Sequence, residues 1–311
     1  MQHDATRASH QDKEALVELA DGVLAYVQPR GGWCVSNAGV LVGRDAVTLI
    51  DCTATESSAR RLRSAIGERT PAQVGTLVVT HHHGDHHNGA AVFGPEVTVV
   101  GHERTRETML REGLNLPSIW PDVHWGDIRL VPPQVTFTDR LTLHVDQLRV
   151  ELIHLGTAHT TGDVVAWLPE QRVLFTGDLT FSQGTPFCLA GSLDGTLEVL
   201  EALRELDAEV VVSGHGPVSG PEVIDANAEY LRWVRELAAA GFAAGQEPLE
   251  VAREAELGAF AELLEPERLV ANVHRAYAEL RGEPRGDELP LASILRDLVA
   301  FNGGQPLPCS A

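Results

Sequence analysis

A histidine cluster directly after a short apolar run constrains this chain more than any other feature. Residues 77–80 read Leu-Val-Val-Thr, and positions 81–87 then hold five of the fourteen histidines of the chain. A β-branched apolar run of this kind is typical of a buried strand. We therefore expect a strand that places several imidazoles at its carboxyl end.

The pattern His81-x-His83-x-Asp85-His86 within this cluster has the spacing of a metal site. In an extended chain, residues two apart point the same way, so His81 and His83 can bind one ion together. Gly84 lets the backbone bend, and Asp85 and His86 can then begin a helix that turns them toward a neighbouring position. One loop is therefore predicted to supply ligands to two metals.

Three further ligand candidates follow later predicted strands. His159 lies in a glycine-flanked turn at 155–163, Asp178 follows the apolar run 173–176, and His215 follows the run 210–213. A dinuclear site needs about six or seven protein ligands, and the histidine loop supplies only some of them. We assign one metal to His81, His83 and His159, the other to Asp85, His86 and His215, and a bridging position to Asp178.

The predicted cofactor is a pair of Zn²⁺ ions, although ligand type alone leaves iron and manganese open. Zinc lowers the pKa of bound water to about 7, which gives hydroxide at neutral pH, and it polarises a carbonyl group. It also stabilises the oxyanion that forms on attack. Asp85 and Asp178 are our candidates for the catalytic carboxylates. The predicted reaction class is hydrolysis or acyl transfer.

Composition excludes several other classes of protein. The net charge of −20 argues against a nucleic-acid partner and against an anionic membrane surface. No apolar stretch approaches the roughly 20 residues of a spanning helix, and residues 1–13 lack the core of a signal peptide. The four cysteines are widely scattered, which argues against a disulfide framework or a cysteine-ligated zinc. We expect a cytoplasmic protein.

The chain alternates strands and helices and then becomes almost wholly helical. We expect a loose N-terminal arm at 1–15, a core at 16–220 and a helical extension at 221–311 that packs on the core. Strands are predicted at 17–27 and 33–42 as a hairpin, at 46–51, 97–101, 135–145, 148–155, 164–168, 173–176 and 210–213. Helices are predicted at 55–69, 102–112, 195–206 with an Asp194 cap, 222–240, 247–254, 256–264, 267–281 and 290–300.

The metal-ligand motifs, in this order, resemble the metallo-β-lactamase fold superfamily. The matching segments are His-x-His-x-Asp-His at 81–86, Gly-Thr-Ala-His-Thr-Thr-Gly-Asp at 156–163, Thr-Gly-Asp at 176–178 and Ser-Gly-His-Gly-Pro at 213–217. The resemblance implies an α/β fold, an αββα sandwich with the metals at one edge of its two sheets. Asp51 resembles the aspartate that supports the metal loop in this superfamily. Asn88-Gly89 stand where many members have two glycines.

A narrower resemblance concerns substrate. The segments 29–37, 120–125, 223–233 and 301–304 are similar to metallo-β-lactamase-type cyclases of bacterial aromatic polyketide pathways, in particular the second-ring cyclase of actinorhodin biosynthesis. The resemblance implies a polyketide thioester held on an acyl carrier protein as the substrate, with ring closure and thioester release as the reaction. The acidic net charge opposes an acidic carrier protein, unless arginines 60, 61 and 63, or 104, 106 and 111, form a local basic face.

Aromatic residues are the candidates for substrate contact. Trp120, His124 and Trp125 could line a pocket for a flat substrate, because indole rings stack on planar groups. The alternative is that these tryptophans pin a long loop onto the core. Further candidates, on metal-side strands or turns, are Trp33, Asn37, Phe181 and Phe187.

Other functions use the same ligands. A lactonase or a thioesterase of small acyl substrates would share the metal chemistry and differ in substrate size. A di-iron oxidoreductase of the same fold would differ in its metal. The C-terminal helices could either cover the cleft or form a homodimer.

Overall fold

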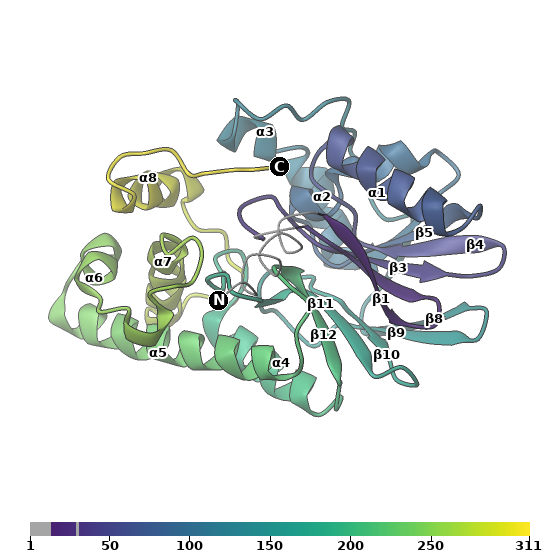
Figure 1. Ribbon diagram of the computed structural model, residues 1–311. Helices are drawn as coiled ribbons and strands as arrows, with labels where there is room; N and C mark the ends of the chain where they lie inside the picture. Colours follow the sequence, from purple (N-terminus) through teal and green to yellow (C-terminus); the bar gives the residue numbers. More distant parts are fainter. Residues whose placement is uncertain (1–13, 29–30) are drawn as a thin grey trace, which may run out of the picture.

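Two β-sheets lie face to face between layers of helices (Figure 1). The computed structural model describes residues 14–28 and 31–311. The first sheet has the order β1-β2-β3-β4-β5-β6-β7 and the second the order β12-β11-β10-β9-β8. The first sheet is antiparallel from β1 to β4 and parallel from β4 to β7. In the second sheet only β11 and β12 are parallel.

The strands of the first sheet are β1 (Ala15–Ala20), β2 (Val23–Val27), β3 (Ala38–Val42), β4 (Ala46–Ile50), β5 (Gln73–Val79), β6 (Thr98–His102) and β7 (Val135–Phe137). Those of the second are β8 (Arg140–Val145), β9 (Leu148–Ile153), β10 (Val165–Leu168), β11 (Val173–Phe181) and β12 (Val210–His215). The helices of the core are α1 (Glu56–Arg69), α2 (Glu103–Glu112), α3 (Leu116–Ile119) and α4 (Leu193–Arg204).

Three apolar clusters hold the layers together. One lies between the sheets, where Ile50 and Val78 meet Val150 and Phe175. A second packs the first sheet against α1 and α2, and a third packs the second sheet against α4 and the C-terminal helices. Each fully buried aliphatic side chain contributes about 1.5–3 kcal/mol. The predicted αββα sandwich with additional C-terminal helices is confirmed.

The C-terminal helices are α5 (Glu222–Ala244), α6 (Pro248–Glu254), α7 (Arg268–Leu280) and α8 (Leu291–Phe301). Helix α5 packs on α4 and on β11, and α7 packs against α5, α6 and α8. The helix predicted at 256–264 is wrong, because only the 3₁₀ turn Gly258–Phe260 forms there. None of the described helices combines the length and apolarity needed to cross a bilayer.

Several predicted element boundaries are also wrong. The run 17–27 divides into β1 and β2, which turn at Asp21-Gly22, where Gly22 has a φ of 72°. The predicted hairpin is retained as the antiparallel pair of β2 and β3, which the segment with Gly31-Gly32 connects. The run 135–145 divides into β7 and β8, which belong to different sheets. Helix α4 is capped by Ser192, whose hydroxyl accepts a hydrogen bond from Gly195 N, while Asp194 lies inside the first turn.

The predicted N-terminal arm lies outside the described residues except for its last two positions. Ala15 belongs to β1, so the arm does not extend to residue 15. The Glu14 carboxylate accepts a hydrogen bond from the Tyr26 hydroxyl at 2.6 Å and forms an ion pair with Arg61 at 2.7 Å. These contacts fix the start of β1 against its neighbour β2 and helix α1.

The N-terminal cap of α2 is a histidine, so we expect the stability of the fold to fall in acid. The His102 ring accepts a hydrogen bond from Arg104 N at 3.1 Å and donates one to the Thr138 carbonyl at 2.8 Å. Burial and the adjacent His154 ring lower the pKa of His102 to about 4. An unfolded histidine has a pKa of about 6.5. Between these pH values the unfolded chain therefore binds a proton that the folded chain does not.

We expect this histidine to lower the free energy of unfolding by up to about 1.4 kcal/mol for each pH unit below about 6.5, until the slope ends near the folded pKa. The variant His102→Asn keeps a capping acceptor and removes the titrating ring. Urea unfolding of both proteins from pH 7 to pH 4 tests this, and a stability difference between them that does not change with pH would contradict it.

Candidate metal centre

The predicted ligands come from one edge of the sandwich, where strands of both sheets end. The loop that follows β5 carries His81, His83, Asp85 and His86, the last two in a short 3₁₀ turn at Gly84–His86. His159 lies in the connection between β9 and β10, and His215 is the last residue of β12. The sandwich thereby brings together side chains that are far apart in the sequence.

Asp178 lies inside β11 and not after it, because the strand continues to Phe181. The register with β12 shifts at Gly177, which has a φ of 52°. A Cβ at Gly177 would lie 2.7 Å from the Thr80 hydroxyl, so a glycine is required there. This local irregularity interrupts the pairing of the strand one residue before the carboxylate.

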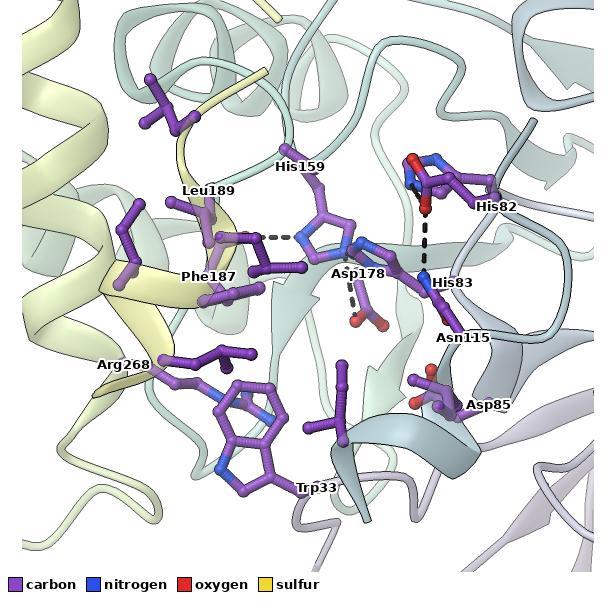
Figure 2. Close-up of a pocket in the computed structure, with 18 of the residues that line it drawn as sticks. Trp33, His82, His83, Asp85, Asn115, His159, Asp178, Phe187, Leu189 and Arg268 are labelled. Atoms are coloured by element: carbon purple, nitrogen blue, oxygen red, sulfur yellow. Dashed lines mark hydrogen bonds and ion pairs between the residues drawn. The ribbon is translucent and has the colours of Figure 1, made fainter. Parts of the chain in front are cut away.

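The first predicted metal group converges as expected. Ligand atoms of His81, His83, His159 and Asp178 all lie within 4.8 Å of one another. The His159 Nε2 atom is 2.8 Å from His83 Nδ1 and 3.5 Å from Asp178 Oδ2. Figure 2 shows the His83 and His159 rings turned toward each other and the Asp178 carboxylate beside them.

The second group contains Asp85, His86 and His215, whose ligand atoms also lie within 4.8 Å of one another. The His215 Nε2 atom is 3.3 Å from Asp85 Oδ2 and 3.4 Å from Asp178 Oδ2. Asp178 Oδ1 is 3.2 Å from His86 Nε2. Asp178 therefore touches both groups, which is the position of a bridging ligand.

The donor set fits divalent metal ions. His81 Nε2, His86 Nε2 and Asp178 Oδ1 are buried and have no hydrogen-bond partner among the described residues. Buried polar atoms without partners are costly, and nearly all such atoms in proteins are paired. Imidazole and carboxylate groups that point at one another are the ligands zinc takes in hydrolytic sites. The arrangement therefore matches the predicted set in residue type and position.

Charge at the site also favours metal binding. Although burial raises it, the imidazoles of His215 and His86 hold the pKa of Asp178 well below its usual value. Burial and the adjacent His159 ring lower the pKa of His83 to about 3, and burial together with His86 and His159 lowers that of His81. Ionised carboxylates and neutral imidazoles are the protonation states that bind metal. Although burial lowers the pKa of both rings, Asp178 raises that of His86, and that of His215 to about 9, so these two rings must release a proton when a metal binds.

Neighbouring groups orient the ligand rings. The Asp51 carboxylate accepts hydrogen bonds from Thr80 N and the Thr80 hydroxyl, both at 2.7 Å, and from His86 Nδ1 at 2.8 Å. The Phe187 carbonyl accepts a hydrogen bond from His159 Nδ1 at 2.5 Å. Such contacts fix the tautomer and direct Nε2 of each ring toward the metals. Asp51 thus lies where its predicted supporting role requires.

Sequence reasoning did not find the oxygen that orients His159. The acceptor is a backbone carbonyl, and a carbonyl carries no signal in the sequence. Ser36 was missed for a related reason, since its hydroxyl donates a hydrogen bond to the Asp85 backbone carbonyl at 2.7 Å. His82, which is not among the predicted ligands, lines the cavity beside the centre.

A cavity of about 520 Å³ opens beside the metal ligands. Its wall includes four of the predicted substrate-contact residues, Trp33, Trp120, Phe181 and Phe187. An aliphatic part of the wall comes from α8 and the C-terminal tail, with Leu291, Ile294, Leu295, Leu298 and Leu307. A polar part comes from α2 and from the connection between α7 and α8, with Thr108, Arg111, Glu112, Asp287 and Glu288. Figure 2 shows Trp33, Phe187, Leu189 and Arg268 on one side of the ligand cluster.

Three predicted contact residues lie elsewhere. The buried Asn37 amide donates to the Ser213 and Gly216 carbonyls, which makes it a link between loops and not a cavity residue. Trp125 is buried and donates to the Trp120 carbonyl, so it pins the loop, as in our alternative. His124 is exposed and is absent from the cavity wall.

Comparison with known proteins identifies relatives over the part of the chain that holds the converging ligands. A family model described as the metallo-beta-lactamase superfamily matches residues 31–215. Metallo-beta-lactamase type 2 of Bacteroides fragilis is 26% identical over 224 residues, which cover 69% of this chain and 84% of that protein. The alpha subunit of 2,4-dinitroanisole O-demethylase from Nocardioides sp. is 28% identical over 176 residues, and this chain spans 50% of its length.

Hydroxyacylglutathione hydrolase of Brucella ovis is 26% identical over 181 residues, which cover 58% of this chain and 62% of that protein. Among solved structures, a metallo-beta-lactamase from Pontibacter korlensis has the same fold, with a TM-score of 0.60 and 21% identity over 71% of this chain and 99% of that one. The family model covers more than half of the chain and reaches all the converging ligands. The chain therefore belongs to the metallo-beta-lactamase superfamily and is a metal-dependent hydrolase of that kind.

Proposed function

We propose that this protein is a dinuclear zinc thioesterase and cyclase that acts on an aromatic polyketide intermediate bound to an acyl carrier protein. The observation that carries this proposal is the cavity of about 520 Å³ with an aromatic and aliphatic wall directly beside the ligand cluster. Pockets of about 300–1,000 Å³ accommodate drug-sized ligands, so the volume suits a molecule of several fused rings.

The aromatic part of the wall supports a planar substrate. The Trp33 ring lies 5.6 Å from the Trp120 ring at 46° and 5.4 Å from the Phe187 ring at 81°. Rings at such distances offer both faces and edges to a flat guest. The Trp120 indole also donates to the Leu307 carbonyl at 3.0 Å, which holds the C-terminal tail over this side of the cavity.

The ligand set defines the chemistry. Two bound zinc ions would supply a nucleophile at neutral pH and Lewis acidity at the thioester carbonyl. His81, His83 and His159 would hold one ion, Asp85, His86 and His215 the other, and Asp178 both. Trp33 and Phe187 would orient the rings of the substrate, and the leucines of α8 would exclude water from the reacting group.

The arginines of α2 are the better candidates for docking an acidic carrier protein, because α2 borders the cavity. Arg60 and Arg61 form ion pairs with Glu56 and Glu14, at 2.6 and 2.7 Å. Arg111 is paired as well, with Glu112 and Glu288 at 3.3 and 3.0 Å, but unlike Arg60 and Arg61 it lines the cavity. The arginines at 104, 106 and 111 are therefore the proposed docking group.

A thioesterase of small acyl substrates is the second candidate. The name of the Brucella relative describes hydrolysis of an acyl group carried on glutathione. A small acyl group would leave most of the cavity unfilled, and this favours the larger substrate. An oxidoreductase would need a redox metal, so elemental analysis of the purified protein separates that alternative.

Matched thioesters test the proposed substrate class. We expect N-acetylcysteamine thioesters of 2-naphthoic acid to react with at least about tenfold higher kcat/KM than the acetyl thioester, because ring stacking contributes on the order of 1 kcal/mol per aromatic pair. Chelation should remove both activities and zinc should restore them. Trp33→Ala should raise KM for the naphthoyl substrate about tenfold, whereas Phe242→Ala, at an exposed ring, serves as the control.

Equal turnover of the two thioesters would favour the small-substrate candidate. No thioester hydrolysis by protein that has regained two zinc ions would contradict both.

A further inference from the structure

Helix α7 presents three buried polar side chains to the backbone of residues 185–189. Arg268, Asn272 and Arg275 lie on one face of the helix, at spacings of four and three residues, and their exposed fractions are 2%, 0% and 1%. Burying two guanidinium groups and an amide is costly unless their hydrogen bonds are used. Their partners are therefore informative.

All three side chains bond to the backbone of residues 185–189, which we call the support segment. The hydrogen bonds run from Arg268 Nη1 to Thr185 O at 3.1 Å, from Asn272 Nδ2 to Pro186 O at 2.7 Å, from Cys188 N to Asn272 Oδ1 at 3.1 Å, and from Arg275 Nε and Nη2 to Leu189 O at 2.9 and 2.5 Å. The segment is thus held at both ends and in the middle.

The residue of the support segment that these bonds leave free is Phe187, and its carbonyl accepts the hydrogen bond from His159 Nδ1. A neutral imidazole carries a single N–H, so this bond places the proton on Nδ1 and leaves Nε2 as the ligand atom. His159 Nε2 is the atom that faces His83 and Asp178. The backbone between Pro186 and Cys188 therefore sets the orientation of a ligand.

We propose that Arg268, Asn272 and Arg275 are positioning residues that orient His159 through the support segment, so that the bonds of Asn272 and Arg275 control the affinity of one metal position and not of the other. This inference rests on the proposed dinuclear function. His159 belongs only to the first ligand group. His86, in the second group, is oriented by Asp51 and has no link to α7 of this kind.

Asn272 offers the cleanest test, because Arg268 also lies over Phe181, which stacks on the His215 ring. The variant Asn272→Leu removes the bonds to Pro186 O and Cys188 N, and a third from Cys188 Sγ at 3.4 Å, and keeps a similar volume. Asn227→Leu is the matched control. Asn227 is equally buried and bonds twice to the Phe181 backbone, but the segment it holds makes no hydrogen bond to His159.

The experiment measures stepwise zinc affinity by chelator competition, together with ¹⁵N shifts of the histidine rings in the zinc-loaded and zinc-free full chain. For Asn272→Leu we expect one zinc affinity to fall by about 10–100-fold, the other to change less than about threefold, and the His159 ring to lose its single tautomer. For Asn227→Leu we expect the His159 ring signals to match those of the wild type.

Two unchanged zinc affinities and an unchanged His159 tautomer in Asn272→Leu would overturn the proposal. If wild-type protein bound fewer than two zinc ions, the dinuclear function would fail, and the His159 tautomer in Asn272→Leu would still decide the role of α7. If Asn272→Leu did not fold, Arg275→Lys replaces it, because lysine keeps the charge and loses the paired donors to Leu189. The same ring signals then decide the outcome.

Discussion

Replacing Asp178 with asparagine should lower kcat/KM for any hydrolysed substrate by roughly a thousandfold or more. The change removes a buried negative charge from a point that touches His81, His159, His86 and His215. An amide of the same shape cannot balance the charge of two cations, so we expect the bound zinc to fall as well. Initial rates and elemental analysis of the same preparation measure both effects.

Asp127→Asn is the control for this experiment, because Asp127 is an exposed carboxylate whose partner is Arg129. It should keep both zinc and activity. An Asp178→Asn protein with two zinc ions and full activity would show that this carboxylate does not bridge, and the assignment of both metal positions would then be wrong.

The second large effect is expected at Gly214, which lies in β12 directly before the proposed ligand His215 and packs against β11. A Cβ at this position would lie 1.9 Å from Asp178 Oδ1 and 2.8 Å from the Gly177 carbonyl carbon. The added methyl group cannot be accommodated unless β11 or the Asp178 carboxylate moves. We expect Gly214→Ala to destabilise the fold by about 3 kcal/mol or more, as overpacking of a tight core does, and to weaken zinc binding.

Gly67→Ala in α1 is the matched substitution, since a Cβ there meets nothing within 4 Å. An alanine inside a helix should stabilise it by up to about 1 kcal/mol. Urea unfolding of the two variants should therefore give shifts of opposite sign. A Gly214→Ala protein as stable as the wild type would mean that the close packing of β11 on β12 is not required.

The convergence of the proposed ligands was predictable because each stands in a short motif next to a strand. The run 77–79 marks β5 by composition alone, and the residues after it must then emerge at the end of the sheet. The same reasoning placed His215. It misplaced the end of β11, because Thr176-Gly177 looks like a strand end, whereas Gly177 adopts a positive φ and the strand continues beyond it.

The cavity wall was less predictable, because it depends on contacts between distant parts of the chain. The sequence predicted a helix at 290–300, but it did not indicate that this helix meets the region of Trp120 and the tail at Leu307. Trp120 and Trp125 are similar in sequence context. Only the fold decides that one lines the cavity and the other pins the loop.

Because strand β11 is wholly buried, it limits which parts of the site can move. All nine of its residues are shielded from solvent, and Val173, Leu174 and Phe175 are paired with both β10 and β12. Its amide protons should exchange with heavy water only when the entire molecule opens. Asp178 and Phe181 thus lie on a buried strand that also forms part of the cavity wall, so we expect any movement that admits ions or guest molecules in other elements of that wall, such as α8 and the C-terminal tail.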